Sequence, residues 1–356
     1  MKLKHLATGL FLTTLLLLST VANAQIRAAF VYVGPAAEMG WSNSHDIGRR
    51  YLEQTFGSQI STEFVELVPE GRAATDVIRQ LAEKNDIVFT TSWGYMIPTL
   101  RAAREYPKVK FENITGMRLR DNLSSFADRA YQPRYLSGML AGAMTQSNTI
   151  GYVAAHPTAE VIRGINAFTL GVRRTNPRAE VQVQWTRQWY APAKARQLAQ
   201  QMIKQGADVL SHHTDSPAVA QAAEQAGIYV ISFHSDMRSL APTAQLASVG
   251  HHWGPYYARS ITALQQQQWQ SGKHWLGMAD DVAQLNHISD KIPAAVRQQV
   301  EQTETAIKQG KFAVFSGPIQ NSRGSTLVRQ DEILSDEDLE RMNWYVDGVV
   351  GDLVSF

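Results

Sequence analysis

The sequence predicts an α/β protein with two Rossmann-like lobes and a cleft between them. Short apolar runs alternate with amphipathic segments of helical length, which is the pattern of βαβ units. The alternation occurs twice in succession, so we expect two parallel sheets. The chain has 356 residues, a length that suits two domains of about 150–180 residues better than one.

Residues 1–24 have the pattern of a secretory signal peptide, which is removed from the mature chain. Lys2 and Lys4 precede an apolar stretch at 6–21, and Ala-Asn-Ala at 22–24 matches the small-x-small cleavage pattern. The alternative is a membrane anchor, but the apolar core is shorter than the ~20 residues that a span requires. We therefore expect cleavage after Ala24 and a mature protein in the bacterial periplasm.

The first series of elements begins at residues 26–33, an almost continuous apolar run that is typical of a parallel strand covered on both faces. The helix expected at 73–84 has Val77, Ile78 and Leu81 on one face. The predicted elements are strands at 26–33, 61–68, 86–91 and 109–115 and helices at 45–55, 73–84 and 98–105.

A helix rich in small residues is expected next, at 131–145. Its Gly138, Ala141 and Gly142 suit close packing at the point where the chain passes from one lobe into the other. The second series then repeats the pattern of the first. Its predicted elements are strands at 149–155, 181–186, 207–211, 228–233 and 246–249 and helices at 160–175, 192–205, 217–225 and 255–268.

The composition excludes several classes of protein. A chain with 44% hydrophobic and 19% charged residues is not disordered. Without Lys2 and Lys4, the 34 basic residues become 32 and equal the 32 acidic ones, so no charge excess indicates nucleic-acid binding. The absence of cysteine excludes disulfides, thiolate catalysis, zinc–cysteine sites and a lipid-attachment cysteine.

Aromatic residues follow several of the predicted strands, at the sheet edge where open α/β folds bind ligands. Trp41 follows the first strand, Trp93 and Tyr95 follow the third, and Trp189 follows the strand at 181–186. Each of them could instead plug a loop onto the core. Their recurrence at one sheet edge favours a site that holds a flat ring by stacking.

Two carboxylates also follow buried strands and precede turns. Asp215 is followed by Ser-Pro, so a role as a cap of the next helix is as plausible as ligand binding. Asp236 precedes no clear helix, which favours a role in ligand binding. A carboxylate only accepts hydrogen bonds, so it would select N–H or O–H groups of the ligand.

The histidine pairs at 212–213 and 251–252 give only weak support for a metal site, because adjacent residues of a strand point to opposite faces. The sequence contains no HExxH motif, GxSxG elbow, P-loop or GxGxxG motif. We therefore expect ligand binding without a metal, a cofactor or a catalytic set.

Several motifs spread along nearly the whole mature chain carry a family resemblance. They are FVYVGP (30–35), GW (40–41), HDIGR (45–49), VPEG (68–71), FTTSWGYM (89–96), YLSGMLAG (135–142), IGYVAAHP (150–157), EVIRGINAFTLGVR (160–173), QGADVLSHHTDSP (205–217), WGPYY (253–257), FSGPI (315–319) and WYVDGVVG (344–351). The chain thereby resembles the basic membrane protein (BMP) family of ABC-transporter substrate-binding proteins, which includes purine nucleoside receptors.

The resemblance implies a type I periplasmic-binding-protein fold, in which two Rossmann-like parallel-sheet lobes joined by three crossovers close around a ligand. By chain order, the crossings are expected near residues 130, 250 and 272. The first lobe would then comprise 25–130 plus 251–272, and the second lobe 131–250 plus 273–356.

The resemblance also bears on the ligand. The nucleoside receptors of the family have an acidic loop with Phe-Asn after the first strand. In this chain Trp41 stands at the stacking Phe and Ser42 at the Asn, while Ala36 and Ala37 stand where acidic residues are usual.

Two further positions depart from the family pattern. Of the two aspartates that follow the strand at 228–233 in the family, Asp236 is retained and His234 replaces the other. His251 stands where a lysine is often found. These departures remove groups that a ribose or a charged partner would use, which favours a nucleobase such as adenine over an intact nucleoside.

We therefore expect a monomeric periplasmic receptor, not an enzyme, that delivers a purine-type ligand to an ABC permease with its ATPase subunits. The candidate ligand-binding residues are Trp41, Ser42, Asn43, Trp93, Tyr95, Asn166, Trp189, Asp215, Asp236 and His251. Two alternatives remain open: an exported purine nucleoside hydrolase, and a ligand-sensing partner of a membrane signalling protein. A hydrolase would need a dense aspartate cluster for a divalent cation, which Ala36 and Ala37 do not supply.

Overall fold

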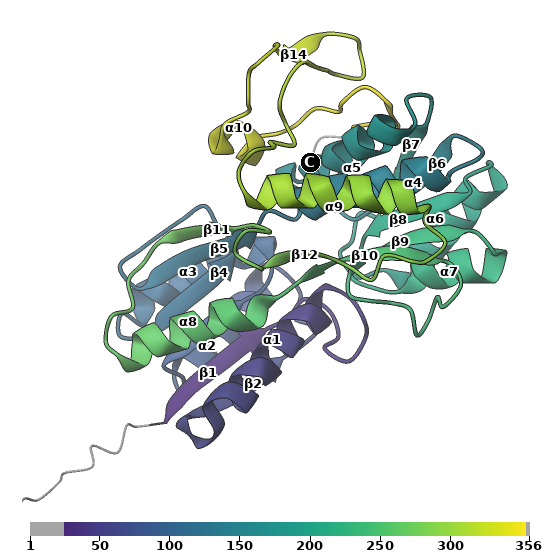
Figure 1. Ribbon diagram of the computed structural model, residues 1–356. Coiled ribbons are helices and arrows are strands. Elements are labelled where there is room, and N and C mark those ends of the chain that lie inside the picture. Colours follow the sequence, from purple (N-terminus) through teal and green to yellow (C-terminus); the bar gives the residue numbers. More distant parts are fainter. Residues whose placement is uncertain (1–24, 354–356) are drawn as a thin grey trace, which may run out of the picture.

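The computed structural model describes residues 25–353, which form two α/β lobes, each built on one main sheet (Figure 1). The expected signal peptide at 1–24 lies outside these residues. Over the described range, no helix is both long enough and apolar enough to cross a membrane. The predicted α/β fold class with two Rossmann-like lobes is confirmed.

The first lobe is formed mainly by the N-terminal part of the chain. Its elements are β1 (Ile26–Val31), α1 (Trp41–Phe56), β2 (Ile60–Val65), α2 (Arg72–Ala82), β3 (Ile87–Thr90), α3 (Met96–Glu105), β4 (Lys110–Ile114), β5 (Leu123–Asp128), α8 (Trp253–Gln265) and β11 (Lys273–Leu276). The strands form a parallel sheet in the order β11-β5-β4-β3-β1-β2. Helices α1 and α8 pack against each other, as do α2 and α3.

The second lobe repeats this strand order. Its elements are α4 (Tyr131–Met144), β6 (Thr149–Ala154), α5 (Ala159–Thr175), β7 (Glu180–Trp185), α6 (Pro192–Lys204), β8 (Val209–His213), α7 (Ala218–Ala226), β9 (Tyr229–His234), β10 (Gln245–His251), β12 (Ala283–Asn286), α9 (Ala294–Lys308) and β15 (Val349–Val350). The sheet has the order β12-β10-β9-β8-β6-β7-β15, and β12 is antiparallel to β10. In both sheets the first strand of the series lies between the second and the third, so each sheet has a switch point at its first strand.

Several elements differ from the sequence prediction. The first helix begins at Trp41, four residues before the predicted start, so Trp41 is a helical residue and not part of a loop. Strand β8 extends through His212 and His213. Strand β5 was not predicted because its sequence, LSSFAD, is half polar, although nearly all of its residues are buried.

Helices α4 and α5 pack closely because both have glycine at the contact. A Cβ atom on Gly138 would lie 2.0 Å from the carbonyl oxygen of Phe168, and one on Gly171 would lie 1.9 Å from that of Tyr135. Both distances are shorter than any real contact of a Cβ atom, so only glycine allows the two backbones to approach this far. The close packing expected from the small residues at 131–145 is therefore present.

Three segments connect the lobes. The chain passes from β5 into α4 at residues 129–130, and from β10 into α8 at residue 252. The third passage lies between β11 and β12, at residues 277–282, because β11 pairs with β5 in the first sheet. The boundary expected at residue 272 therefore lies several residues too early.

The C-terminal segment wraps over the second lobe and lies at the top of Figure 1. It contains a short hairpin, β13 (Ile319–Gln320) and β14 (Thr326–Val328), and the helix α10 (Asp336–Glu340). Ser335 caps α10 in a capping box with Asp338. The segment ends in β15, which adds a parallel strand beside β7.

Candidate functional site

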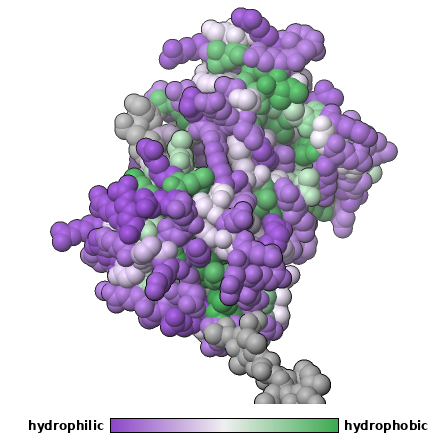
Figure 2. Space-filling view, turned by 90° about the vertical axis from the view of Figure 1, so that its left-hand side faces the viewer, coloured by the Kyte–Doolittle hydropathy of each residue, from purple (hydrophilic) through white to green (hydrophobic). Residues whose placement is uncertain are grey.

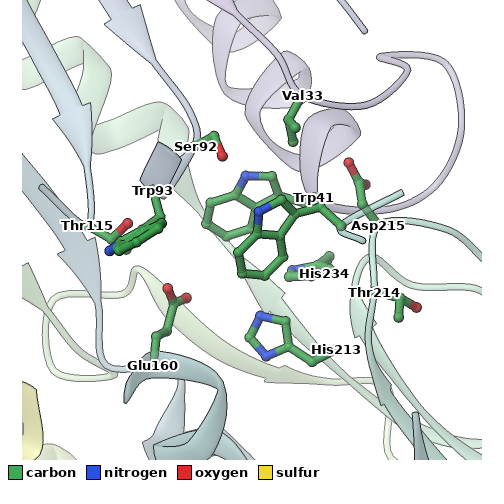
Figure 3. A pocket seen from close by; sticks show the side chains of 11 residues that line it. Val33, Trp41, Ser92, Trp93, Thr115, Glu160, His213, Thr214, Asp215 and His234 are labelled. Carbon is green, nitrogen blue, oxygen red and sulfur yellow. The ribbon is translucent and has the colours of Figure 1, made fainter. Parts of the chain in front are cut away.

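A pocket lies between the two lobes, where the strands of both sheets end (Figure 3). It contains about 400 Å³ of space not occupied by protein atoms, part of which is open to solvent. The lining residues are Val33, Trp41, Ser92, Trp93, Thr115, Glu160, Trp189, His213, Thr214, Asp215 and His234. They follow β1, β3 and β4 in the first lobe and β6, β7, β8 and β9 in the second, so the pocket joins the switch points of both sheets.

Trp41 provides a fixed aromatic wall of the pocket. Its indole Nε1 donates a hydrogen bond to the backbone carbonyl of Thr91 at 2.7 Å. Its ring makes edge contacts with the rings of His234, at 5.1 Å between centroids, and His251, at 5.2 Å. In Figure 3 the indole lies between Trp93 on one side and Asp215 on the other. A ring held in this way can stack on a flat ligand without losing rotamer freedom on binding.

Trp189 and Trp93 add aromatic surface from opposite lobes. The Nε1 of Trp189 donates to Glu70 Oε1 at 3.2 Å, and the same oxygen accepts from the backbone N–H of Gly94 at 3.0 Å. Glu70 therefore links a tryptophan of the second lobe to the turn of the first lobe that carries Trp93. The side chain of Trp93 is 40% exposed at the pocket mouth.

Asp215 connects the pocket to the start of α1. Its carboxylate is buried and accepts hydrogen bonds from the Ser42 hydroxyl at 2.8 Å and from the Ser42 backbone N–H at 3.3 Å. Burial raises the pKa of Asp215 to about 6, although the hydrogen bonds from Ser42 oppose this shift. Above that pH the group is ionised and presents only acceptors to a ligand.

Glu160 and two histidines complete the polar part of the lining. Burial raises the pKa of Glu160, in the first turn of α5, to about 7, so this carboxyl can donate as well as accept near neutral pH. Burial also lowers the pKa of His213 and of His234 well below the usual histidine range. Both imidazoles are therefore neutral. No group of three or more His, Asp or Glu side chains within residues 25–353 is arranged to hold a metal ion.

Four of the ten predicted site residues line the pocket, namely Trp41, Trp93, Trp189 and Asp215. Three others lie nearby but support the fold. Ser42 is buried and donates to Asp215. Asn43 donates to the backbone carbonyl of Ala36 at 2.7 Å. Tyr95 is buried in the core of the first lobe, where its hydroxyl donates to the carbonyl of Val68 at 2.6 Å.

Asn166 and Asp236 lie outside the lining of this pocket. Asn166 lies on the α5 face that holds the C-terminal segment: it donates to the carbonyl of Trp344 at 2.8 Å and accepts from the backbone N–H of Val346 at 3.1 Å. Asp236 lies outside the lining and forms an ion pair with Arg238 at 2.8 Å. That guanidinium supplies the hydrogen-bond donors that a ligand was expected to bring.

His251 lies directly behind two residues that line the pocket, Trp41 and His234. Its ring contacts Trp41 and hydrogen-bonds to His234, which does line the pocket. The sequence indicates His234 only as a replacement in a family motif, and it does not predict that Glu160, His213 and Thr214 line the pocket. His213 and Thr214 directly follow the strand predicted at 207–211, but their residue types alone do not indicate that they face the pocket. Nothing in the sequence singles out Glu160.

The position of Asp236 leads to a testable prediction. Asp236→Asn removes a charge that is satisfied by Arg238 on the surface, so ligand affinity is expected to stay within twofold of the unmodified protein. Isothermal titration of both proteins with the same ligand measures this. Asp215→Asn is the comparison within the pocket, and we expect it to weaken binding of a ligand that presents N–H groups. A large loss of affinity in the Asp236 variant would contradict the assignment.

Two Rossmann-like lobes with a ligand-sized pocket at the carboxyl ends of both sheets define a two-lobed substrate-binding protein. The solved structure of an ABC transporter solute-binding protein from Aeropyrum pernix K1 has this fold: it aligns with a TM-score of 0.71 over 89% of this chain and 96% of its own, at 16% identity. The family model described as ABC transporter substrate-binding protein PnrA-like matches residues 25–315. The chain belongs to this family, and the resemblance seen in the sequence is confirmed.

Two curated relatives are similar over almost the whole chain. A purine-binding protein of Brucella abortus is 38% identical over 329 residues, which cover 92% of this chain and 94% of the relative. A putative ABC transporter glucose-binding protein of Haloferax volcanii is 34% identical over 331 residues, covering 93% of this chain and 82% of the relative. The family is one of substrate-binding proteins.

Proposed function

We propose that this protein is a periplasmic receptor that captures a purine nucleobase and delivers it to an ABC permease in the inner membrane. The observation that carries the proposal is the combination of three tryptophans with hydrogen-bond acceptors in one pocket between the lobes. Stacking on an aromatic side chain contributes about 1–3 kcal/mol per base. The relative from Brucella abortus, described as a purine-binding protein, supports the same class of ligand.

The preference for a free base over a nucleoside is supported by the loop between β1 and α1. This loop contributes Val33 to the lining, which then resumes only at Trp41. Ala36 and Ala37, which replace acidic residues of the nucleoside receptors, are therefore not among the lining residues. Asp215 and Glu160 remain as carboxyl groups that a base N–H could reach.

The chemistry of the pocket is that of recognition. Neutral His213 and His234 and the carboxyl groups of Asp215 and Glu160 orient the edge of a ring, while the tryptophans hold its faces. A receptor of this kind works as a monomer in the periplasm, exported by the signal peptide at 1–24, and releases its ligand to a permease driven by ATPase subunits.

The experiment that tests the proposal identifies the ligand directly. The purified protein is denatured, the released small molecules are identified by mass spectrometry, and the refolded protein is titrated calorimetrically with adenine, guanine, adenosine and glucose. We expect a purine base among the released molecules and tighter binding of a base than of adenosine. Binding of glucose without binding of any purine would overturn the proposal, as would conversion of adenosine to free base during the titration.

A further inference from the structure

A chain of hydrogen bonds leads from the first lobe through two histidines to the pocket. The Oδ2 atom of Asp128, at the end of β5, lies 2.6 Å from Nδ1 of His251, the last residue of β10. The Nε2 atom of His251 lies 2.9 Å from Nδ1 of His234. The side chains of Asp128 and His251 are 3% and 1% exposed, so water does not compete for either bond.

The direction of each hydrogen bond follows from the chemistry of the groups. A carboxylate carries no hydrogen and only accepts, so the Nδ1–H of His251 donates to Asp128. When His251 is neutral, it has a single N–H, so its Nε2 is a bare acceptor. His234 must therefore place its own hydrogen on Nδ1 in order to donate to His251. Its Nε2 then carries no hydrogen.

His234 is also held so that it takes part in the pocket wall. It is the last residue of β9, its backbone has a positive φ of 72°, and Trp41 packs against its ring at 5.1 Å. Few residues other than glycine adopt this backbone conformation, and strained residues of this kind concentrate at functional sites. Among residues 25–353, His234 makes one side-chain hydrogen bond, the one through Nδ1, so Nε2 is left for a ligand.

The electrostatic surroundings agree with a neutral ring. Burial lowers the pKa of His234 well below the usual histidine range. The Arg134 guanidinium also disfavours a positive charge on His234. A protonated His234, which would donate from both nitrogens, is excluded on these grounds near neutral pH.

We infer that His251 is neutral and that Asp128 and His251 are positioning residues, which fix His234 in its Nδ1–H tautomer. The pocket then presents a bare ring nitrogen and selects ligands with an N–H group. For purines this inference rests on the proposed function. A free base has an N–H on its five-membered ring, whereas a nucleoside carries the sugar at that nitrogen and keeps only a bare N7. Two bare nitrogens cannot form a hydrogen bond. For a base whose five-membered ring faces His234, the hydrogen-bonded chain of Asp128, His251 and His234 (the relay) therefore discriminates against glycosylated and N9-alkylated bases.

The first test needs no ligand. Nitrogen NMR spectra of the full-length mature protein with ¹⁵N-labelled histidine distinguish protonated from bare ring nitrogens, and the variants His234→Gln and His251→Gln assign the signals. We expect both histidines to have a protonated Nδ1 and a bare Nε2. A hydrogen on Nε2 of His234 would overturn the inference. A doubly protonated His251 would overturn it as well, because its Nε2–H would donate to Nδ1 of His234 and the direction of that hydrogen bond would be reversed.

The second test measures selectivity in variants of the relay. In Asp128→Asn the amide can either donate or accept, so the tautomer of His251 is no longer imposed. The matched control is Asp281→Asn, because Asp281 contacts the exposed His252 at 3.2 Å, away from the pocket. If Asp128→Asn does not fold, His251→Phe removes the relay while it keeps an aromatic ring beside Trp41.

The measured quantity is the ratio of the Kd for 9-methyladenine to the Kd for adenine. In the unmodified protein and the Asp281 variant we expect a ratio of about 10 or more. In the relay variants we expect the ratio to fall severalfold. The methyl group adds the same bulk in every variant. If the relay had a merely structural role, its loss would weaken the binding of adenine and of 9-methyladenine equally. An unchanged ratio of the two Kd values would therefore overturn the inference. If no purine binds while the NMR tautomers are as expected, the proposed function fails and the tautomer assignment stands.

Discussion

Replacing Trp41 with alanine is expected to weaken binding of a purine base by about 1–3 kcal/mol, the contribution of one base–aromatic stack. This corresponds to an increase in Kd of roughly 5- to 150-fold. Because Trp41 begins α1 and packs against His45, His251 and Trp253, the variant should also be less stable without ligand. Titration calorimetry and thermal unfolding of the ligand-free protein separate the two effects.

The matched control for this variant is Trp269→Ala. Trp269 donates from Nε1 to Glu112 at 2.9 Å and lies outside the pocket, so its loss should affect stability but not affinity. Trp41→Phe keeps an aromatic face and should recover much of the affinity. Normal purine binding by Trp41→Ala would show that the base does not stack on this residue.

Replacing Gly171 with alanine is expected to destabilise the fold by about 2–3 kcal/mol. The added methyl group would lie 1.9 Å from the carbonyl oxygen of Tyr135, which belongs to the backbone of α4 and cannot rotate away. Relief requires α4 and α5 to separate, and the core of the second lobe lies around these helices. Urea unfolding monitored by circular dichroism gives the difference in free energy of unfolding.

The same substitution at Gly164 provides the control within the same helix. The nearest atom to a Cβ at Gly164 is 3.9 Å away, so the methyl group has space. Alanine should then be neutral or stabilise α5 by about 0.5–1 kcal/mol, because glycine is the poorer helix former. Equal stabilities of the two variants would show that the helix contact tolerates separation.

The sequence predicts the alternating core of both lobes because buried parallel strands such as β1 and β3 are continuous apolar runs. It does not predict β5, which is buried but contains Ser124 and Ser125. It also does not predict β11 and β15, which join their sheets only by pairing with partners that are distant in the sequence. Local pattern carries no information about such pairing.

For the site, the sequence identifies the tryptophans but not their polar neighbours. A tryptophan after a strand is rare enough to be noticed, whereas Glu160 resembles any acidic residue in the first turn of a helix. Asp236 follows β9 and has the sequence context of a ligand-binding carboxylate, yet Arg238 two residues later binds it. Whether a carboxylate faces a pocket or a neighbouring guanidinium depends on the direction of one turn, which composition and spacing do not determine.

Strands β11 and β15 also constrain the order in which the molecule can be assembled. β11 covers β5 at the edge of the first sheet, and β15 covers β7 at the edge of the second. A nascent chain that has emerged only to residue 250 therefore leaves both edges open, with unpaired backbone groups along each strand. Both sheet edges are complete only when residues 273–276 and 349–350 are available, so the last strand to join the second sheet lies within a few residues of the end of the described chain.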